Sequence, residues 1–115
     1  MNVLITGGTG NIGSRLVIPL VRRGDRVFVL DVRSQPNFES PEFRRAQVIT
    51  GNLGDRNTVL ELVKSCKIDS IFHFGAVLSG SAEENPYEAW RANMDGTLNV
   101  LDAARFGGAQ RVIFS

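Results

Sequence analysis

Residues 6–13 read Thr-Gly-Gly-Thr-Gly-Asn-Ile-Gly, and this stretch decides the fold. It follows the apolar, β-branched run Asn2 to Thr6, which is typical of a buried strand. Apolar residues at helical spacing come next, and Gly24 then supplies a helix stop. The helical stripe consists of Ile12, Leu16, Val17, Leu20 and Val21. The sequence therefore predicts a strand, a tight glycine turn and a helix in direct succession.

The glycines of this stretch fit two spacings. Gly8, Gly10 and Gly13 fit G-x-G-x-x-G, and Gly7 in place of Gly8 gives G-x-x-G-x-x-G. Both patterns supply a glycine for the turn, one where the backbone approaches a pyrophosphate, and one where helix meets sheet. Amides at the start of the helix then point at the anion. The predicted pyrophosphate contacts are Gly7, Gly10, Asn11, Ile12 and Gly13.

Apolar runs continue to alternate with helical segments along the rest of the chain. The runs are Asn2 to Thr6, Arg26 to Asp31, Ala46 to Thr50, Ser70 to Phe74 and Arg111 to Ser115. Parallel strands need crossover connections, and such crossovers are right-handed. The fold class predicted is therefore α/β, a doubly wound parallel sheet of about five strands, the Rossmann fold.

Capping residues predict where the other helices begin and end. Asp55 is the expected N-cap of the second helix. Asn85 is the expected N-cap of the third, followed by Pro86 at its first position, and this helix should run to about Arg105 before Gly107-Gly108 ends it. The stretch from Ser34 to Arg45 is expected to be a loop or a short, poorly formed helix.

Asp31 ends the second predicted strand, about 20 residues after the glycine stretch, where an acidic side chain can accept hydrogen bonds from ribose hydroxyls. Such a carboxylate would repel a 2′-phosphate, so NAD is favoured over NADP, although Arg33 works against that choice. The alternative for Asp31 is a solvated charge after a strand. Val32 and Arg33 are included in the predicted cofactor site with Asp31.

Composition excludes several classes of function. Lys and Arg number 13 against 12 Asp and Glu, the net charge is +1, and the basic residues are scattered, so neither nucleic acid nor an anionic membrane is an expected partner. No apolar stretch is long enough to be a signal peptide core or a membrane span. Cys66 is the sole cysteine, which excludes an intramolecular disulfide and favours a cytoplasmic location.

The N-terminal Thr-Gly-Gly-Thr-Gly-Asn-Ile-Gly stretch resembles the signature of extended short-chain dehydrogenases, the NAD-dependent epimerase/dehydratase family, and the resemblance covers the whole chain. Gly51-Asn52-Leu53-Gly54-Asp55 resembles the family's stretch after the third strand, where an acidic residue often holds the adenine amino group. Asn52 replaces that acid, and its amide can still accept the hydrogen bond. Leu53 is then expected to pack on the adenine ring.

Two further stretches resemble the same family. His73-Phe74-Gly75-Ala76 is similar to its His-x-Ala-Ala turn, which implies that the backbone of Phe74, Gly75 and Ala76 lines the ribose and nicotinamide. His73 itself is expected to be structural, with no catalytic role and no metal. Residues 93–101 are similar to the family's Asn-x-x-Gly-Thr-x-Asn helix, which implies that Asn93 bonds backbone near the active site and that Gly96 allows close packing. A helix packed by apolar residues alone is the alternative.

Residues 76–90 are similar to the corresponding stretch of short-chain L-threonine 3-dehydrogenases. In those enzymes a serine at the place of Ser79 helps to hold the substrate; the alternative for Ser79 is a capping hydroxyl in a loop. The family's Tyr-x-x-x-Lys pair is not found, because Tyr87 is the only tyrosine and Arg91 stands four residues later. We therefore expect no catalytic residue here, and residues 1–115 should form an NAD-binding domain that stops before that pair.

Three functions stay open on this evidence. The first is oxidation of a secondary alcohol, with L-threonine or a related hydroxy acid as substrate. The second is a nucleotide-sugar epimerase or dehydratase with tightly held NAD, and the third is a non-catalytic dinucleotide-binding module. A small-molecule substrate, and a homodimer in the full-length protein, are the expected partners.

Overall fold

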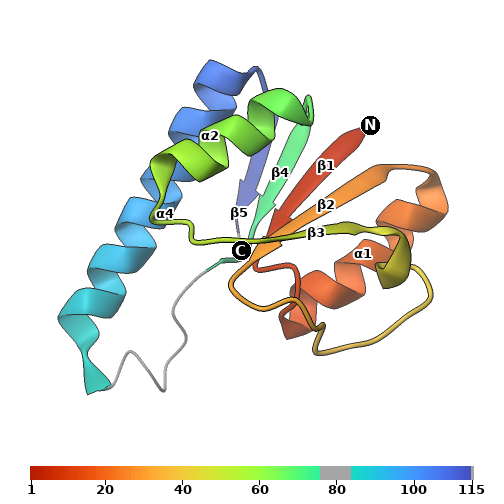
Figure 1. Cartoon of the computed structure of the whole chain (residues 1–115), viewed down its shortest axis with the longest axis horizontal. Helices are drawn as coiled ribbons and strands as arrows, with labels where there is room; N and C mark the ends of the chain where they lie inside the picture. The colour runs from red at the N-terminus through yellow and green to blue at the C-terminus, as the bar shows by residue number, and fades with distance from the viewer. Residues whose placement is uncertain (76–83, 115) are drawn as a thin grey trace.

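The computed structural model describes residues 1–75 and 84–114. Their elements, in chain order, are β1 (Asn2–Thr6), α1 (Asn11–Arg23), β2 (Arg26–Asp31), the 3-10 turn η1 (Phe43–Arg45), β3 (Gln47–Thr50), α2 (Arg56–Ser65), β4 (Ser70–His73), α4 (Pro86–Gly107) and β5 (Arg111–Phe114). The strands form one parallel sheet in the order β3-β2-β1-β4-β5 (Figure 1). The predicted doubly wound α/β fold is confirmed.

Alternation of side chains along the central strands builds a core on each face of the sheet. Leu4 and its neighbours on one face pack against α2 and α4, in a cluster that includes Val63 and Val100. Val3 and Ile5 point to the other face and pack with Val17 of α1. Because both faces are covered, the central strands are apolar without a solvent-facing side. Figure 1 shows this arrangement, with α1 on one side of the sheet and α2 and α4 together on the other.

The predicted helix starts are confirmed by their caps. The Asp55 carboxylate accepts from the backbone N–H of Asn57 and Thr58, and the Asn85 side chain accepts from Glu88 N–H with Pro86 at the first helical position. Each cap satisfies amides that a helix start leaves without a partner.

Small differences from the predicted bounds have local causes. Ala46 closes η1 by donating its N–H to the Phe43 carbonyl, so β3 begins one residue later than expected. Helix α4 continues through Gly107, which packs against Val63, and ends at Gly108 in the left-handed region at φ 86°. The glycine pair therefore divides into one packing residue and one stop.

The segment between β2 and β3 is a loop with the single turn η1, as predicted. No helix within residues 1–75 and 84–114 is both long and apolar enough to cross a membrane.

Candidate nucleotide-binding site

Parallel pairing brings the carboxyl ends of four strands to one edge of the sheet. Thr6 at the end of β1 is in register with Leu30 and His73, and Asp31 is in register with Thr50. The segments that follow these strands therefore begin side by side. The strand order reverses between β1 and β4, and ligands of open α/β sheets bind outside the carboxyl ends at such a point.

The glycine loop, residues 7–13, follows β1 at this edge. Gly7 adopts φ +67° and donates its N–H to the Leu30 carbonyl at 2.9 Å. A Cβ atom on Gly7 would lie 2.8 Å from backbone atoms of Phe74 and Gly75. A side chain at position 7 would therefore be strained in conformation and would also push apart the ends of β1 and β4.

The other three glycines account for both sequence spacings. A Cβ atom on Gly8 would lie 2.6 Å from Val29 Cγ1, and one on Gly10 would lie 3.2 Å from the Gly7 carbonyl oxygen. A Cβ atom on Gly13 would lie 2.6 Å from that same oxygen and 2.7 Å from Gly8 Cα. Gly8 and Gly13 are needed for close packing, and position 10 has little room for a side chain, so the loop uses the two overlapping patterns at once.

Helix α1 begins at this loop with backbone amides that have no partner within the helix. Gly10 is its N-cap and provides no side-chain cap, and the first helical bond runs from Ser14 N–H to the Gly10 carbonyl at 2.9 Å. The amides of Asn11, Ile12 and Gly13 precede that bond, so they have no carbonyl four residues earlier within the helix. Such amides, at the positive end of a helix dipole, suit an anion.

The Asp31 carboxylate is bonded to the glycine loop. Its Oδ2 accepts from Thr9 N–H at 3.1 Å and from the Thr9 hydroxyl at 2.6 Å, and its Oδ1 accepts from Val32 N–H at 2.7 Å. A carboxylate has about four acceptor positions, so it can still accept from a ligand hydroxyl. Asp31 therefore fixes the loop to the end of β2 in addition to any contact with ribose. Sequence reasoning missed Thr9, whose only signal was a hydroxyl residue inside the loop.

Asn52 and Leu53 follow β3 at the same edge. Asn52 is exposed, and its side-chain oxygen accepts from Gly54 N–H at 2.8 Å, which closes a local turn. Leu53 is half-buried, and a Cβ atom on Gly75 would overlap its Cδ1, while one on Gly96 would lie 3.2 Å from its Cβ. Both glycines are therefore packed closely against Leu53, as expected for Gly96.

His73 lies in a buried network with Thr6 and Thr97, which we call the threonine–histidine network. The Thr6 hydroxyl oxygen accepts from the N–H groups of Phe74 and Gly75, at 3.1 Å each, and lies 2.6 Å from His73 Nδ1. A hydroxyl has one proton and two acceptor positions, so this proton is donated to Nδ1. His73 then carries its own proton on Nε2 and donates it to the Thr97 hydroxyl at 3.1 Å.

Burial lowers the pKa of His73, which is 6 % exposed. The neutral ring fits the network, because a second ring proton on Nδ1 would face the proton of Thr6. The structure thus gives His73 the structural role predicted for it. Thr6 and Thr97 were not identified from the sequence as its partners.

The remaining predicted residues divide into two groups. Asn93 lies half-buried in α4 and makes a polar or electrostatic contact. Ala76 and Ser79 lie outside the described residues. Among the described residues, no group of three or more His, Cys, Asp or Glu side chains could hold a metal ion.

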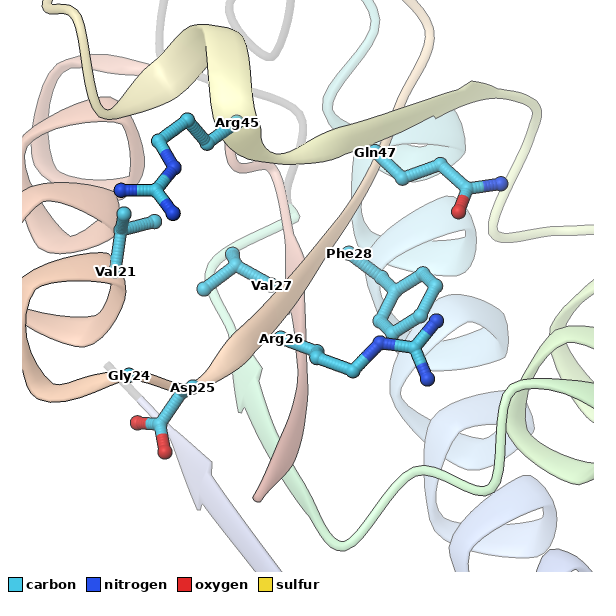
Figure 2. A pocket seen from close by; sticks show the side chains of 8 residues that line it. All are labelled: Val21, Gly24, Asp25, Arg26, Val27, Phe28, Arg45 and Gln47. Atoms are coloured by element: carbon cyan, nitrogen blue, oxygen red, sulfur yellow. The ribbon is translucent and has the colours of Figure 1, made fainter.

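A pocket of about 300 Å³ lies at the opposite end of β2, between Val21 of α1 and Gln47 of β3 (Figure 2). Asp25 at its rim forms ion pairs with Arg23 and with the N-terminal amine. Because this pocket is at the amino end of the strand, it is separate from the candidate site.

Comparison with known proteins identifies the family. Residues 3–115 match the model of the NAD dependent epimerase/dehydratase family. An uncharacterized epimerase/dehydratase of Staphylococcus aureus (strain USA300) is 39 % identical over 105 residues, which are 90 % of this chain and 32 % of the relative. The chain belongs to the NAD dependent epimerase/dehydratase family, and it spans about a third of the length of this curated relative.

Solved structures agree with this assignment. UDP-glucose 4-epimerase from Brucella ovis in complex with NAD is 32 % identical, with a TM-score of 0.84 over 98 % of this chain and 34 % of that one. A GalE-like L-threonine dehydrogenase from Cupriavidus necator is also 32 % identical, with a TM-score of 0.82 over 97 % and 36 %. The nucleotide expected from the sequence, NAD, is thus present in a solved relative. The two enzyme activities considered from the sequence, nucleotide-sugar epimerase and L-threonine dehydrogenase, both occur among these solved structures.

Proposed function

We propose that this chain binds NAD across the carboxyl edge of its sheet, as the nucleotide-binding part of an enzyme that oxidises a secondary alcohol. The glycine loop carries the proposal. Its backbone is packed so closely that a Cβ atom on Gly7 or Gly13 would meet other backbone atoms, and it leads into a helix start that has no side-chain cap and whose first amides have no partner within the helix. A phosphate needs this combination of close backbone approach and unsatisfied amides.

The residues present fit the rest of the nucleotide. The amides of Gly10, Asn11, Ile12 and Gly13, with Gly7, would hold the pyrophosphate. Asp31, with Val32 and Arg33, would hold the adenosine ribose, and Asn52 and Leu53 would hold the adenine. Phe74, Gly75 and Ala76, with Asn93, would lie along the ribose and nicotinamide. Bound NAD would accept the hydride that leaves the carbon of the alcohol.

L-threonine, or a related hydroxy acid, is the substrate that we propose. The likeness of residues 76–90 to L-threonine 3-dehydrogenases and the 32 % identity to the L-threonine dehydrogenase of Cupriavidus necator support it. Ser79 would contact this substrate. The catalytic acid and base would lie outside residues 1–115, so this chain alone would bind nucleotide without turnover.

A nucleotide-sugar epimerase is the second candidate, favoured by the likeness to UDP-glucose 4-epimerases. Spectrophotometry separates the candidates: the full-length enzyme is mixed with NAD and either L-threonine or a UDP-sugar. Net NADH with L-threonine supports the dehydrogenase. Conversion of the UDP-sugar without net NADH supports the epimerase, and binding without either reaction supports a non-catalytic module.

Pairing of two chains through α4 is part of this proposal. Exposed apolar side chains lie at helical spacing along α4, namely Tyr87, Trp90, Met94, Leu98 and Leu101. Exposed apolar surface of this kind is commonly covered by another subunit. Sedimentation of the full-length enzyme tests this, and a monomer at all concentrations would contradict it. A cytoplasmic location stays a prediction from the single cysteine.

A further inference from the structure

Three side chains near the end of β2 form a connected set around Thr9. The Asp31 carboxylate accepts from the Thr9 hydroxyl at 2.6 Å. The Asn37 backbone N–H donates to the Thr9 carbonyl at 2.7 Å. The Asn37 side-chain oxygen accepts from the Arg33 guanidinium at 3.2 Å. The acidic and the basic residue that follow β2 are therefore both tied to the same residue of the glycine loop, one directly and one through Asn37.

The two charges are held by neutral partners. Among the described residues, the ion pairs involve neither Asp31 nor Arg33. Arg33 is exposed, and its guanidinium donates a hydrogen bond to the Asn37 side-chain oxygen. The guanidinium is therefore directed toward the 34–40 loop. A guanidinium is the group best suited to bind a 2′-phosphate.

The 34–40 loop is itself anchored to the start of α1. Phe38 N–H donates to the Ser14 hydroxyl at 3.1 Å, and the Arg15 guanidinium lies 4.2 Å from the centre of the Phe38 ring. The Ser14 hydroxyl donates in turn to the Gly10 carbonyl at 2.6 Å. Asn37 is thus presented to Arg33 by a loop with three separate attachments to the glycine loop and α1.

We propose that Asn37 is a specificity-determining residue, which favours NAD over NADP by engaging the Arg33 guanidinium, so that this group is less free to bind a phosphate at the 2′ position of the adenosine ribose. This inference rests on the proposed function, because it concerns the nucleotide bound at the same edge. Asp31 favours the free 2′-hydroxyl by accepting its hydrogen bond. Asn37 adds a second preference by occupying Arg33, a cation two residues from Asp31 that would favour the phosphate.

The test compares NADH and NADPH binding by this chain, followed by nucleotide fluorescence, in the unmodified form and in Asn37→Ala. Loss of the side-chain amide frees Arg33 but keeps the backbone bond to Thr9, and position 37 is exposed, so the variant should fold normally. In Asn37→Ala we expect the affinity for NADPH relative to NADH to rise by about 3- to 10-fold, because one charge-assisted contact at a surface contributes an effect of this size. The gain should shrink at high salt.

Three further variants assign the effect to Arg33. The double variant Asn37→Ala/Arg33→Ala should show the same ratio as Arg33→Ala alone, because the gain requires the Arg33 guanidinium. Asn37→Asp would hold Arg33 more tightly, so it should leave the preference for NADH unchanged or stronger. A gain that survives removal of Arg33 would overturn the inference.

Other outcomes also decide it. An unchanged ratio in Asn37→Ala, with NADH still bound, overturns this inference and leaves the proposed function standing. An unmodified chain that prefers NADPH overturns it as well. An unmodified, folded chain that binds neither nucleotide overturns both.

Discussion

The glycine loop and the threonine–histidine network lie at the same edge of the sheet but are built in different ways. The loop presents backbone amides, and its close packing depends on missing side chains at Gly7 and Gly13. The network uses the buried side chains of Thr6 and His73 and the half-buried side chain of Thr97, which are far apart in the sequence. The glycine loop is therefore specified by the local spacing of residues, and the threonine–histidine network by tertiary contacts.

The largest effect is expected from a side chain inside the glycine loop. In Gly13→Ala the new Cβ would lie 2.6 Å from the Gly7 carbonyl oxygen. This oxygen belongs to the backbone, which cannot move away by a change of rotamer. We expect the free energy of unfolding to fall by about 1–3 kcal/mol, the range for overpacking. NADH affinity should fall by more than about tenfold, or 1.4 kcal/mol. Urea unfolding and NADH titration measure both.

Gly24→Ala is the matched control, because Gly24 also has a conformational role but no atom within 4 Å of its Cβ position. It should cost about 1 kcal/mol of stability through its φ of +96° and leave NADH binding unchanged. Equal losses of binding in the two variants would contradict the role given to the loop.

The network should be weakened by Thr6→Val, which keeps the shape and removes the hydroxyl. The N–H of Gly75 loses its bond to this oxygen, and His73 Nδ1 loses its donor. A buried polar group left unsatisfied should lower the free energy of unfolding by about 2 kcal/mol. Thr50→Val is the control, since Thr50 also ends a parallel strand but is exposed, and its effect should stay within about 0.5 kcal/mol. Similar losses in both would argue against the network.

Asp31 connects the loop to the ribose that we propose it binds. In Asp31→Asn the amide oxygen can still accept from Thr9, but the amide NH2 replaces the oxygen that accepts from Val32 N–H, so the free energy of unfolding should fall by about 1 kcal/mol. NADH affinity should fall by about tenfold, because a hydrogen bond to a charged acceptor is replaced by a neutral one. Glu39→Gln removes an exposed carboxylate from the neighbouring loop and should have no effect. Unaltered NADH binding by Asp31→Asn would favour a purely structural Asp31.

The smallest effect is a pH dependence that comes from His73, the only histidine. Its folded-state pKa lies below the ordinary value of 6.5, because burial disfavours the charged ring. Below pH 6.5 the unfolded chain binds a proton that the folded chain does not bind. The free energy of unfolding should therefore fall by at most about 1.4 kcal/mol per pH unit from pH 6.5 down to the folded pKa. His73→Gln should flatten the profile in that window, and an unchanged slope would contradict this assignment.

The glycine loop could be predicted from the sequence and the threonine–histidine network could not, because the first depends on local spacing and the second on tertiary contacts. The elements and the glycine loop could be predicted because their signals act over a few residues. These signals are glycine spacing, the caps at Asp55 and Asn85, and apolar strand runs. The hydroxyls of Thr6, Thr9 and Thr97 gain their roles from partners on other elements, which no local pattern specifies. The packing of Gly107 on Val63 likewise depends on a partner from another element.

The most direct test of the central claim is an NMR titration of the isotope-labelled chain with NAD, which follows each backbone amide. We predict saturable shifts concentrated at residues 10–13 of the glycine loop and at residues 31–33. Little change is expected at Gly24 to Arg26, beside the pocket at the amino end of β2. Shifts confined to the amino end of β2, or no saturable shifts in a folded chain, would contradict the account.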